Sequence, residues 1–195
     1  HRLTNRVTII IGTRPEAIKL APVIIALKNC KEIETRILLT GQHIEMVCDA
    51  LNLFGLKWDN NLELMKKNQD LNLFTSRCLT KVSKDYKEYP PKLVLVQGDT
   101  SSAFVGALAA YQENIPIGHV EAGLRTDNIK EPFPEEANRR LISQIADLHF
   151  APTEIAKKNL IDSKVCGEII KTGNTIIDAV QTISKKTRKP SILNF

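Results

Sequence analysis

The feature that most constrains the fold of this chain is a regular alternation of short apolar segments with longer segments of helical pattern. The first apolar segment, Val7–Ile11, is β-branched almost throughout, which is typical of a strand buried on both faces. Strands that alternate with helices in this way predict βαβ units, right-handed crossovers and a parallel sheet. The sequence therefore predicts an α/β fold built on one doubly wound parallel sheet.

The same alternation places the individual elements along the chain. The expected strands are Val7–Ile11, Thr35–Thr40, Leu93–Gln97, Ile117–Val120, His149–Ala151 and Ile169–Thr172. The expected helices are Pro15–Asn29, Ile44–Phe54, Asp70–Tyr86, Ser101–Glu113, Pro134–Ala146, Glu154–Ser163 and Thr175–Lys186. The segment Gly55–Asn68 is less regular and has room for one short strand. The pattern stops after Lys186, so we expect residues 1–186 to form one domain and 187–195 to be a linker towards a second domain that this sequence does not contain.

Composition excludes several classes of protein. The 195 residues are 43% hydrophobic, which supports a substantial core and argues against disorder. The net charge is +5, but aromatic residues make up only 5% and are not interleaved with basic ones, which argues against nucleic-acid binding. No apolar run approaches the roughly 20 residues of a membrane helix, and no secretory leader is visible. We therefore expect a cytoplasmic protein that contacts neither nucleic acid nor membrane.

Cysteine and histidine spacing gives no sign of a metal site. The four cysteines are scattered, which favours reduced thiols over a zinc site or a disulfide framework; they are Cys30, Cys48, Cys78 and Cys166. His43, His119 and His149 are not at ligand spacing from carboxylates, and His149 is expected to be a core residue. The chain also lacks a Walker A motif and a G-x-G-x-x-G motif, so ATP and nicotinamide cofactors are not expected.

Four polar clusters follow predicted strands, at the ends where ligands bind in open parallel sheets. They are Gly12–Lys19, Gly98–Ser101, Glu121–Thr126 and Gly173–Thr175. The first is a strand, a glycine turn and a helix that starts near Pro15, an arrangement that forms an anion site. Arg14 and Lys19 add two cations there, although an ordinary turn with two solvated charges explains the segment equally well.

Three acidic residues are expected near this edge of the sheet, and each has a structural alternative. Asp99 precedes a helix and is a favoured helix cap. Glu121 follows an apolar strand, where an ion pair to Arg125 or Arg14 would explain it. Glu135 lies in the first turn of a helix, where acidic side chains are favoured by the helix dipole. If the three face one pocket, their charges raise one another's pKa and prepare them for acid–base chemistry.

The motifs GTRPEAIK, TGQH, GDT, HVEAGLRT, PEEANR and GNTIIDAV occur in the order and spacing of the non-hydrolysing UDP-N-acetylglucosamine 2-epimerases. The resemblance runs from about Val7 to about Val180. It implies a Rossmann-like domain that is the N-terminal half of a two-domain GT-B architecture, with the active site between the domains. It also implies interconversion of UDP-GlcNAc and UDP-ManNAc without cofactor or metal, usually by a homodimer, in the synthesis of cell-envelope polysaccharides.

The resemblance also implies roles for individual residues. Asp99, Glu121 and Glu135 match the family's acid–base carboxylates near C2 of the sugar. The matching substrate-binding residues are Arg14, Lys19, Asp99, Glu121 and Asn174. Gln42 and Gln69 match positions that bacterial members use for a second, activating UDP-GlcNAc, although Asn68 stands where such members often carry arginine. A hydrolysing epimerase, a GT-B glycosyltransferase and an inactive nucleotide-sugar-binding remnant remain as alternatives.

Overall fold

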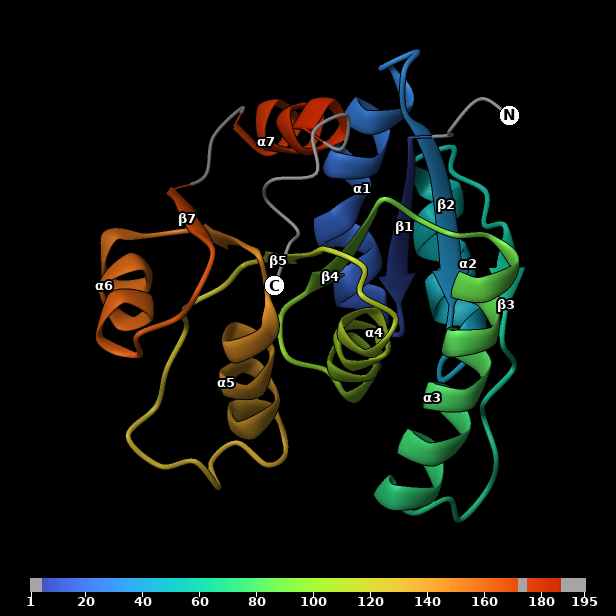
Figure 1. Ribbon diagram of the computed structural model, residues 1–195. Helices are drawn as coiled ribbons and strands as arrows, with labels where there is room; N and C mark the ends of the chain where they lie inside the picture. Colours follow the sequence, from blue (N-terminus) through green and yellow to red (C-terminus); the bar gives the residue numbers. More distant parts are fainter. Residues whose placement is uncertain (1–4, 172–174, 187–195) are drawn as a thin grey trace.

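A computed structural model describes residues 5–171 and 175–186 of the chain. These residues form a seven-stranded, wholly parallel sheet with the strand order β3-β2-β1-β4-β5-β6-β7 (Figure 1). The strands are β1 Arg6–Ile11, β2 Glu34–Leu39, β3 Asn60–Asn61, β4 Leu93–Gln97, β5 Ile117–Val120, β6 Leu148–Ala151 and β7 Glu168–Lys171. The helices are α1 Arg14–Lys28, α2 Ile44–Leu53, α3 Leu71–Glu88, α4 Ser101–Gln112, α5 Glu135–Ile145, α6 Glu154–Asp162 and α7 Thr175–Lys186.

The doubly wound sheet expected from the alternation is confirmed, and the expected elements agree with the structure to within two residues at each end. The short strand in the irregular segment is β3, which pairs with β2 at Leu38 and Leu39. Thr172 at the end of the last expected strand, Gly173 and the candidate site residue Asn174 in the fourth polar cluster, and the expected linker, residues 187–195, lie outside the described residues.

The side chains of the central strands explain why helices cover both faces of the sheet. In β1, Ile9 and Ile11 join a core formed with α1, α2 and α7, whereas Ile10 joins a core formed with α3, α4 and α5. All three isoleucines are fully buried. Burying apolar side chains on both faces requires the continuous β-branched run seen in the sequence. Helix α6 packs separately, with Ala156 and Leu160 against the β6–β7 edge.

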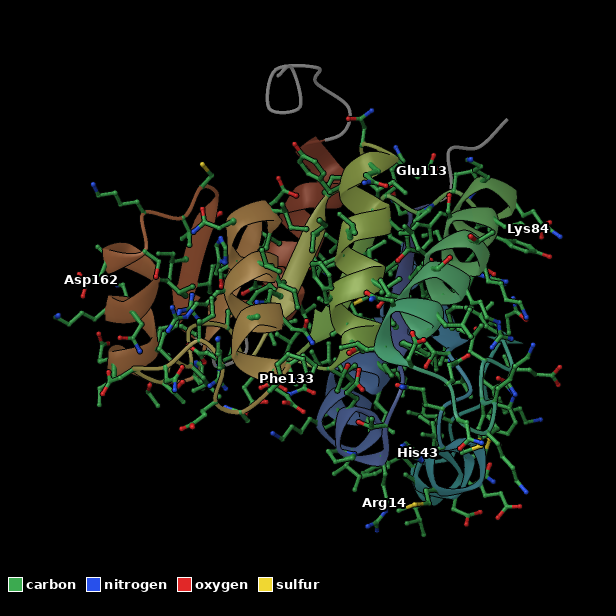
Figure 2. The ribbon with its side chains drawn as sticks, turned by 90° about the horizontal axis from the view of Figure 1, so that it is seen from below. Arg14, His43, Lys84, Glu113, Phe133 and Asp162 are labelled. Carbon is green, nitrogen blue, oxygen red and sulfur yellow. The ribbon has the colours of Figure 1, made fainter. Side chains whose placement is uncertain are left out.

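Parallel pairing puts the carboxyl ends of the strands on one edge of the sheet. Gly12, Gly98 and Glu121 directly follow β1, β4 and β5, which are neighbours in the sheet. The registers Ile9–Leu95 and Gln97–Val120 bring these three strand ends together. The structure thus confirms that three of the four polar clusters lie along one rim, which we call the strand-end rim. Figure 2 views the molecule from below Figure 1, the side to which the β1 arrow points.

Candidate active site

The turn between β1 and α1 presents two cations at the strand-end rim. Thr13 is the helix N-cap, and its backbone N–H and hydroxyl both donate to Oε1 of Glu16, at 3.0 and 2.9 Å. This capping arrangement fixes the start of α1, where Arg14 in the first turn and Lys19 in the second are exposed (Figure 2 labels Arg14). Gly12 is required for close approach, because a Cβ there would lie 2.4 Å from Oγ of Ser102.

Glu121 lies on the rim directly after β5 and is held by two side chains. Nζ of Lys19 lies 3.0 Å from Oε1 and 2.9 Å from Oε2 of Glu121. The side-chain amide of Gln97, the buried last residue of β4, also donates to Oε2. The expected alternative, an ion pair of Glu121 with Arg125 or Arg14, is wrong, because Lys19 is the partner. Glu121 has φ of 62°, a left-handed conformation that is rare for a non-glycine residue.

Gly123, two residues further on, packs closely against α6. Its φ is 92°, and a Cβ there would lie 2.3 Å from the backbone oxygen of Ala156 in α6. This glycine therefore allows the loop after β5 to pack against α6.

Asp99 is not the cap of α4, so the expected helix-cap role is wrong. The cap is Thr100, whose hydroxyl accepts a hydrogen bond from the backbone N–H of Ala103 at 3.0 Å. Asp99 instead accepts from Nη1 of Arg139 at 3.2 Å. Burial raises the pKa of Asp99, Arg139 opposes that rise, and the nearby charges of Glu135 and Glu121 add to it. Glu121 and Glu135 are therefore close enough to Asp99 to affect its ionisation.

Glu135 and Glu136 begin α5 but have different surroundings. Oε2 of Glu135 is buried and has no hydrogen-bond partner among the described residues. Glu136 is fully buried and pairs with Arg139 and Arg140. Burial works to raise the pKa of Glu136, but hydrogen bonds from Arg140, the Thr126 backbone and Arg139 lower it overall. The helix dipole favours acidic side chains at both positions, so it does not predict this difference.

Two polar residues beneath the rim were missed by the sequence analysis. Glu16 is almost fully buried, and burial raises its pKa to about 7 against the lowering effect of hydrogen bonds from Thr13 and Thr100. The spacing Thr13-x-x-Glu16 is a capping-box signature and could have revealed it. The second, Gln97, had no such signal, because nothing local in the sequence shows that its amide contacts Glu121.

The buried histidines have structural contacts at the strand ends. Nε2 of His119 lies 2.7 Å from the backbone oxygen of Gly98, and burial lowers the pKa of His119 to about 4. His149 is fully buried, as expected, and its Nε2 lies 2.7 Å from the backbone oxygen of Cys166. Within residues 5–171 and 175–186, no group of three or more histidine, cysteine, aspartate and glutamate side chains is arranged to hold a metal ion.

Gln42 and Gln69 line one cavity of about 310 Å³ beside the rim, together with His43 and Lys66. Oε1 of Gln42 accepts a hydrogen bond from Ser102 at 2.9 Å, and Ser102 is the second residue of α4. The side-chain amide of Gln69 donates to the backbone oxygen of Leu64 at 3.2 Å. The structure thus brings together the two glutamines that the resemblance assigns to a second nucleotide-sugar site.

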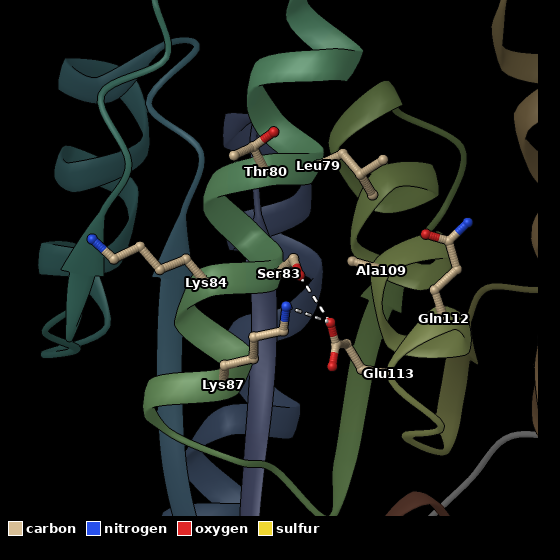
Figure 3. A pocket seen from close by; sticks show the side chains of 8 residues that line it. All are labelled: Leu79, Thr80, Ser83, Lys84, Lys87, Ala109, Gln112 and Glu113. Atoms are coloured by element: carbon tan, nitrogen blue, oxygen red, sulfur yellow. Dashed lines mark hydrogen bonds and ion pairs between the residues drawn. The ribbon is translucent and has the colours of Figure 1, made fainter.

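A larger cavity of about 520 Å³ lies elsewhere, between α3 and α4 (Figure 3). Glu113 extends across it towards α3, where its Oε1 lies 2.9 Å from Oγ of Ser83 and 3.4 Å from Nζ of Lys87. The lining residues of α4 are at its C-terminal end, which lies away from the strand-end rim. This cavity therefore does not belong to the candidate active site.

Comparisons with known proteins identify the kind of fold and then the family. A lipopolysaccharide outer core galactosyltransferase of 15% identity shares the fold, with a TM-score of 0.60 over 85% of this chain and 44% of that one. The chain thus has a Rossmann-like fold of the kind found in GT-B proteins. A family model described as UDP-N-acetylglucosamine 2-epimerase matches residues 25–194, and the chain belongs to that family.

Individual relatives agree with this placement. The UDP-N-acetylglucosamine 2-epimerase of Bacillus subtilis strain 168 is 48% identical over 178 residues, covering 91% of this chain and 47% of the relative. A crystal structure of UDP-GlcNAc 2-epimerase from Neisseria meningitidis bound to UDP-GlcNAc is 44% identical with a TM-score of 0.83, covering 95% of this chain and 50% of that one. The chain spans about half the length of the curated relatives it matches.

Proposed function

We propose that this chain is the N-terminal half of an enzyme that interconverts UDP-GlcNAc and UDP-ManNAc by inverting C2 of the sugar. The observation that carries the proposal is the strand-end rim, where Glu121 and Glu135 lie close enough to Asp99 to act on its charge and Lys19 pairs with Glu121. The family membership and the UDP-GlcNAc bound to the Neisseria relative support the choice of substrate.

The chemistry requires two proton transfers at one carbon. No carbonyl flanks C2, so its proton is not acidic, and a route through elimination of UDP avoids a free carbanion. One carboxylate takes the C2 proton while the C1–O bond breaks, UDP leaves with that electron pair, and 2-acetamidoglucal remains. A second carboxylate then delivers a proton to the opposite face of C2 as UDP adds back to C1. Arg14, Lys19 and the N-terminus of α1 stabilise the charge on departing UDP.

The proposal includes a second domain that closes over the substrate. Residues 187–195 connect to that domain, and Asn174 contributes to the substrate site. Gln42 and Gln69 hold an activating UDP-GlcNAc in the cavity of about 310 Å³. The whole protein is a cytoplasmic homodimer that supplies cell-envelope polysaccharide synthesis. In the described part of the chain, no helix is both long and apolar enough to cross a membrane.

The experiment uses this chain joined after residue 195 to the second half of the Bacillus subtilis relative; we call this the joined protein. UDP-GlcNAc is supplied in D₂O and the products are followed by NMR. UDP-ManNAc with deuterium at C2 is expected. Free ManNAc would instead indicate a hydrolysing epimerase, and transfer of the sugar to an acceptor would indicate a glycosyltransferase. Binding without turnover would reduce the chain to a nucleotide-sugar-binding module.

A further inference from the structure

The first turns of α5 contact the Asp99 turn at two points. Nη1 of Arg139 donates to Oδ2 of Asp99 at 3.2 Å, and Nδ2 of Asn138 donates to the backbone oxygen of Asp99 at 3.0 Å. The Arg139 side chain is only 11% exposed, so this pair is largely shielded from solvent. One contact holds the carboxylate and the other holds the backbone that carries it. Both contacts come from the motif PEEANR, which also contains the candidate carboxylate Glu135.

Glu136 holds the guanidinium of Arg139 from its other edge. Nε of Arg139 donates to Oε2 of the fully buried Glu136. Oε1 of Glu136 accepts from Nε of Arg140 at 2.7 Å and from the backbone N–H of Thr126 at 3.1 Å. Glu136 is therefore fixed on several sides, and Arg139 is fixed by Glu136. A guanidinium held in this way has one orientation in which to meet a second carboxylate.

The charges around Asp99 show why a fixed cation is needed there. The charged groups that act on it are Arg139 and Glu135 from α5 and Glu121 from the turn after β5. Lys19 lies against Glu121 through both carboxylate oxygens. Two carboxylates thus repel the charged form of Asp99, and Arg139 is the cation that opposes them.

We propose that Arg139 is a positioning residue for the epimerase reaction: oriented by Glu136, it holds the Asp99 carboxylate in place and in its charged form at the strand-end rim. The inference rests on the proposed function, because Asp99 matters to the reaction only if the rim is the active site. It separates the roles within PEEANR. Glu135 faces the sugar. Glu136 orients Arg139, Arg139 holds the Asp99 carboxylate, and Asn138 holds the Asp99 backbone.

The direct test is a ¹³C NMR titration of the Asp99 side-chain carboxyl in the 195-residue chain. In Arg139→Gln the pKa of Asp99 should rise by about one unit or more, because an opposing charge is lost and two repelling ones remain. Arg140→Gln is the matched control, since Arg140 also pairs with Glu136 but does not contact Asp99. An unchanged Asp99 titration in Arg139→Gln, or an equal rise in Arg140→Gln, would overturn the proposal.

Arg139→Lys covers the case in which Arg139→Gln does not fold, with ¹H–¹⁵N spectra as the check on folding. The lysine ammonium cannot contact both Glu136 and Asp99 as the forked guanidinium does. It stays paired with the buried Glu136 and leaves Asp99. The pKa of Asp99 should therefore rise in this variant too, by a smaller amount, and an unchanged value would count against the proposal. Neither titration depends on turnover, so failure of the joined protein to act on UDP-GlcNAc would reject the proposed function separately.

In an active joined protein, a second readout separates positioning from general stability. Arg139→Lys should lower kcat by roughly tenfold or more and change KM by no more than about twofold, because Asp99 acts on the reacting carbon while other groups bind UDP. Arg140→Lys should leave both near wild type. A wild-type kcat in Arg139→Lys would show that Asp99 does not need this support.

Discussion

Lys19 and Glu121 are 102 residues apart in the sequence, yet the ammonium of Lys19 lies about equally close to both carboxylate oxygens of Glu121, at 2.9 and 3.0 Å. The contact joins the first turns of α1 to the end of β5. A substrate phosphate that reaches Lys19 is thereby placed next to a carboxylate proposed to act on the sugar. In the proposed reaction, this one ion pair would couple substrate binding to proton transfer.

Lys19→Met in the joined protein should weaken UDP-GlcNAc binding by about tenfold or more. The loss of one charge-assisted hydrogen bond costs about 1.5–3 kcal/mol, and each 1.4 kcal/mol is tenfold in affinity. Isothermal titration calorimetry measures the change. Lys28→Met is the control, because Lys28 is exposed on the last turn of the same helix. Equal losses in the two variants would mean that Lys19 contributes only general positive charge.

Replacing each candidate carboxylate with its amide should lower kcat of the joined protein by roughly 100-fold or more, because the amide keeps the shape but cannot transfer the proton. The variants are Asp99→Asn, Glu121→Gln and Glu135→Gln. Substrate affinity should fall less, since UDP carries most of the binding contacts, and deuterium incorporation at C2 should slow in parallel. Glu131→Gln, in the exposed loop before α5, is the control. A variant with normal kcat and normal deuterium incorporation would remove that residue from the proton-transfer scheme.

Glu16 should make the free energy of unfolding fall as pH rises. Burial raises its pKa to about 7 in the folded chain from an ordinary value of 4.5, so between these pH values the unfolded state releases the proton first. The loss of unfolding free energy caused by Glu16 is absent below pH 4.5, grows up to about pH 7 and is complete above it. At one pKa unit per 1.36 kcal/mol, it reaches about 3 kcal/mol.

Glu16→Gln isolates this effect, because glutamine keeps an oxygen to accept from Thr13 but does not ionise. Urea unfolding at several pH values should show the variant gaining on wild type between about pH 5 and 7. A constant difference between the two proteins over this range would show that the Glu16 carboxyl does not titrate there.

Gly12→Ala should destabilise the chain by about 1–3 kcal/mol, the usual cost of forcing an extra carbon into a packed site. The new Cβ would lie 2.4 Å from Oγ and 2.7 Å from Cβ of Ser102. Urea denaturation measures the loss. Adding Ser102→Gly removes both clashing atoms and should recover part of it, whereas independent, additive effects would show that these residues do not collide.

The 195-residue chain alone should show little or no turnover. The relatives are about twice as long, and a rim with no opposing domain leaves a reactive glycal open to water. NMR product analysis at matched concentrations of the chain and the joined protein makes the comparison. Turnover by the chain at the rate of the joined protein would show that one half suffices.

Most of the fold could be predicted because it depends on patterns within single segments. The β-branched run of Val7–Ile11 and the alternation after it specify buried parallel strands, and β4 and β5 occur where expected. The cap of α4 could not be decided in this way. Asp99 and Thr100 are adjacent and both are favoured caps, so only the backbone geometry shows that Thr100 is the cap.

The candidate site could be predicted in position but not in its contacts. Parallel topology alone brings Gly12, Gly98 and Glu121 to one edge. It does not say which cation meets Glu121, because Lys19, Arg14 and Arg125 are all near that edge. Side-chain packing between α1 and β5 selects Lys19. Likewise, Arg139 became visible only when α5 and the Asp99 turn were seen in contact.

The left-handed backbone at Glu121 has a consequence for anyone who reuses this scaffold. A non-glycine residue held at φ of 62° stores about 1–2 kcal/mol of strain that glycine would not carry. Glycine at position 121 would relieve that strain but would lose the hydrogen bonds of the carboxylate to Lys19 and Gln97. The two effects on stability oppose each other, so directed evolution here needs a selection for chemistry as well as for folding.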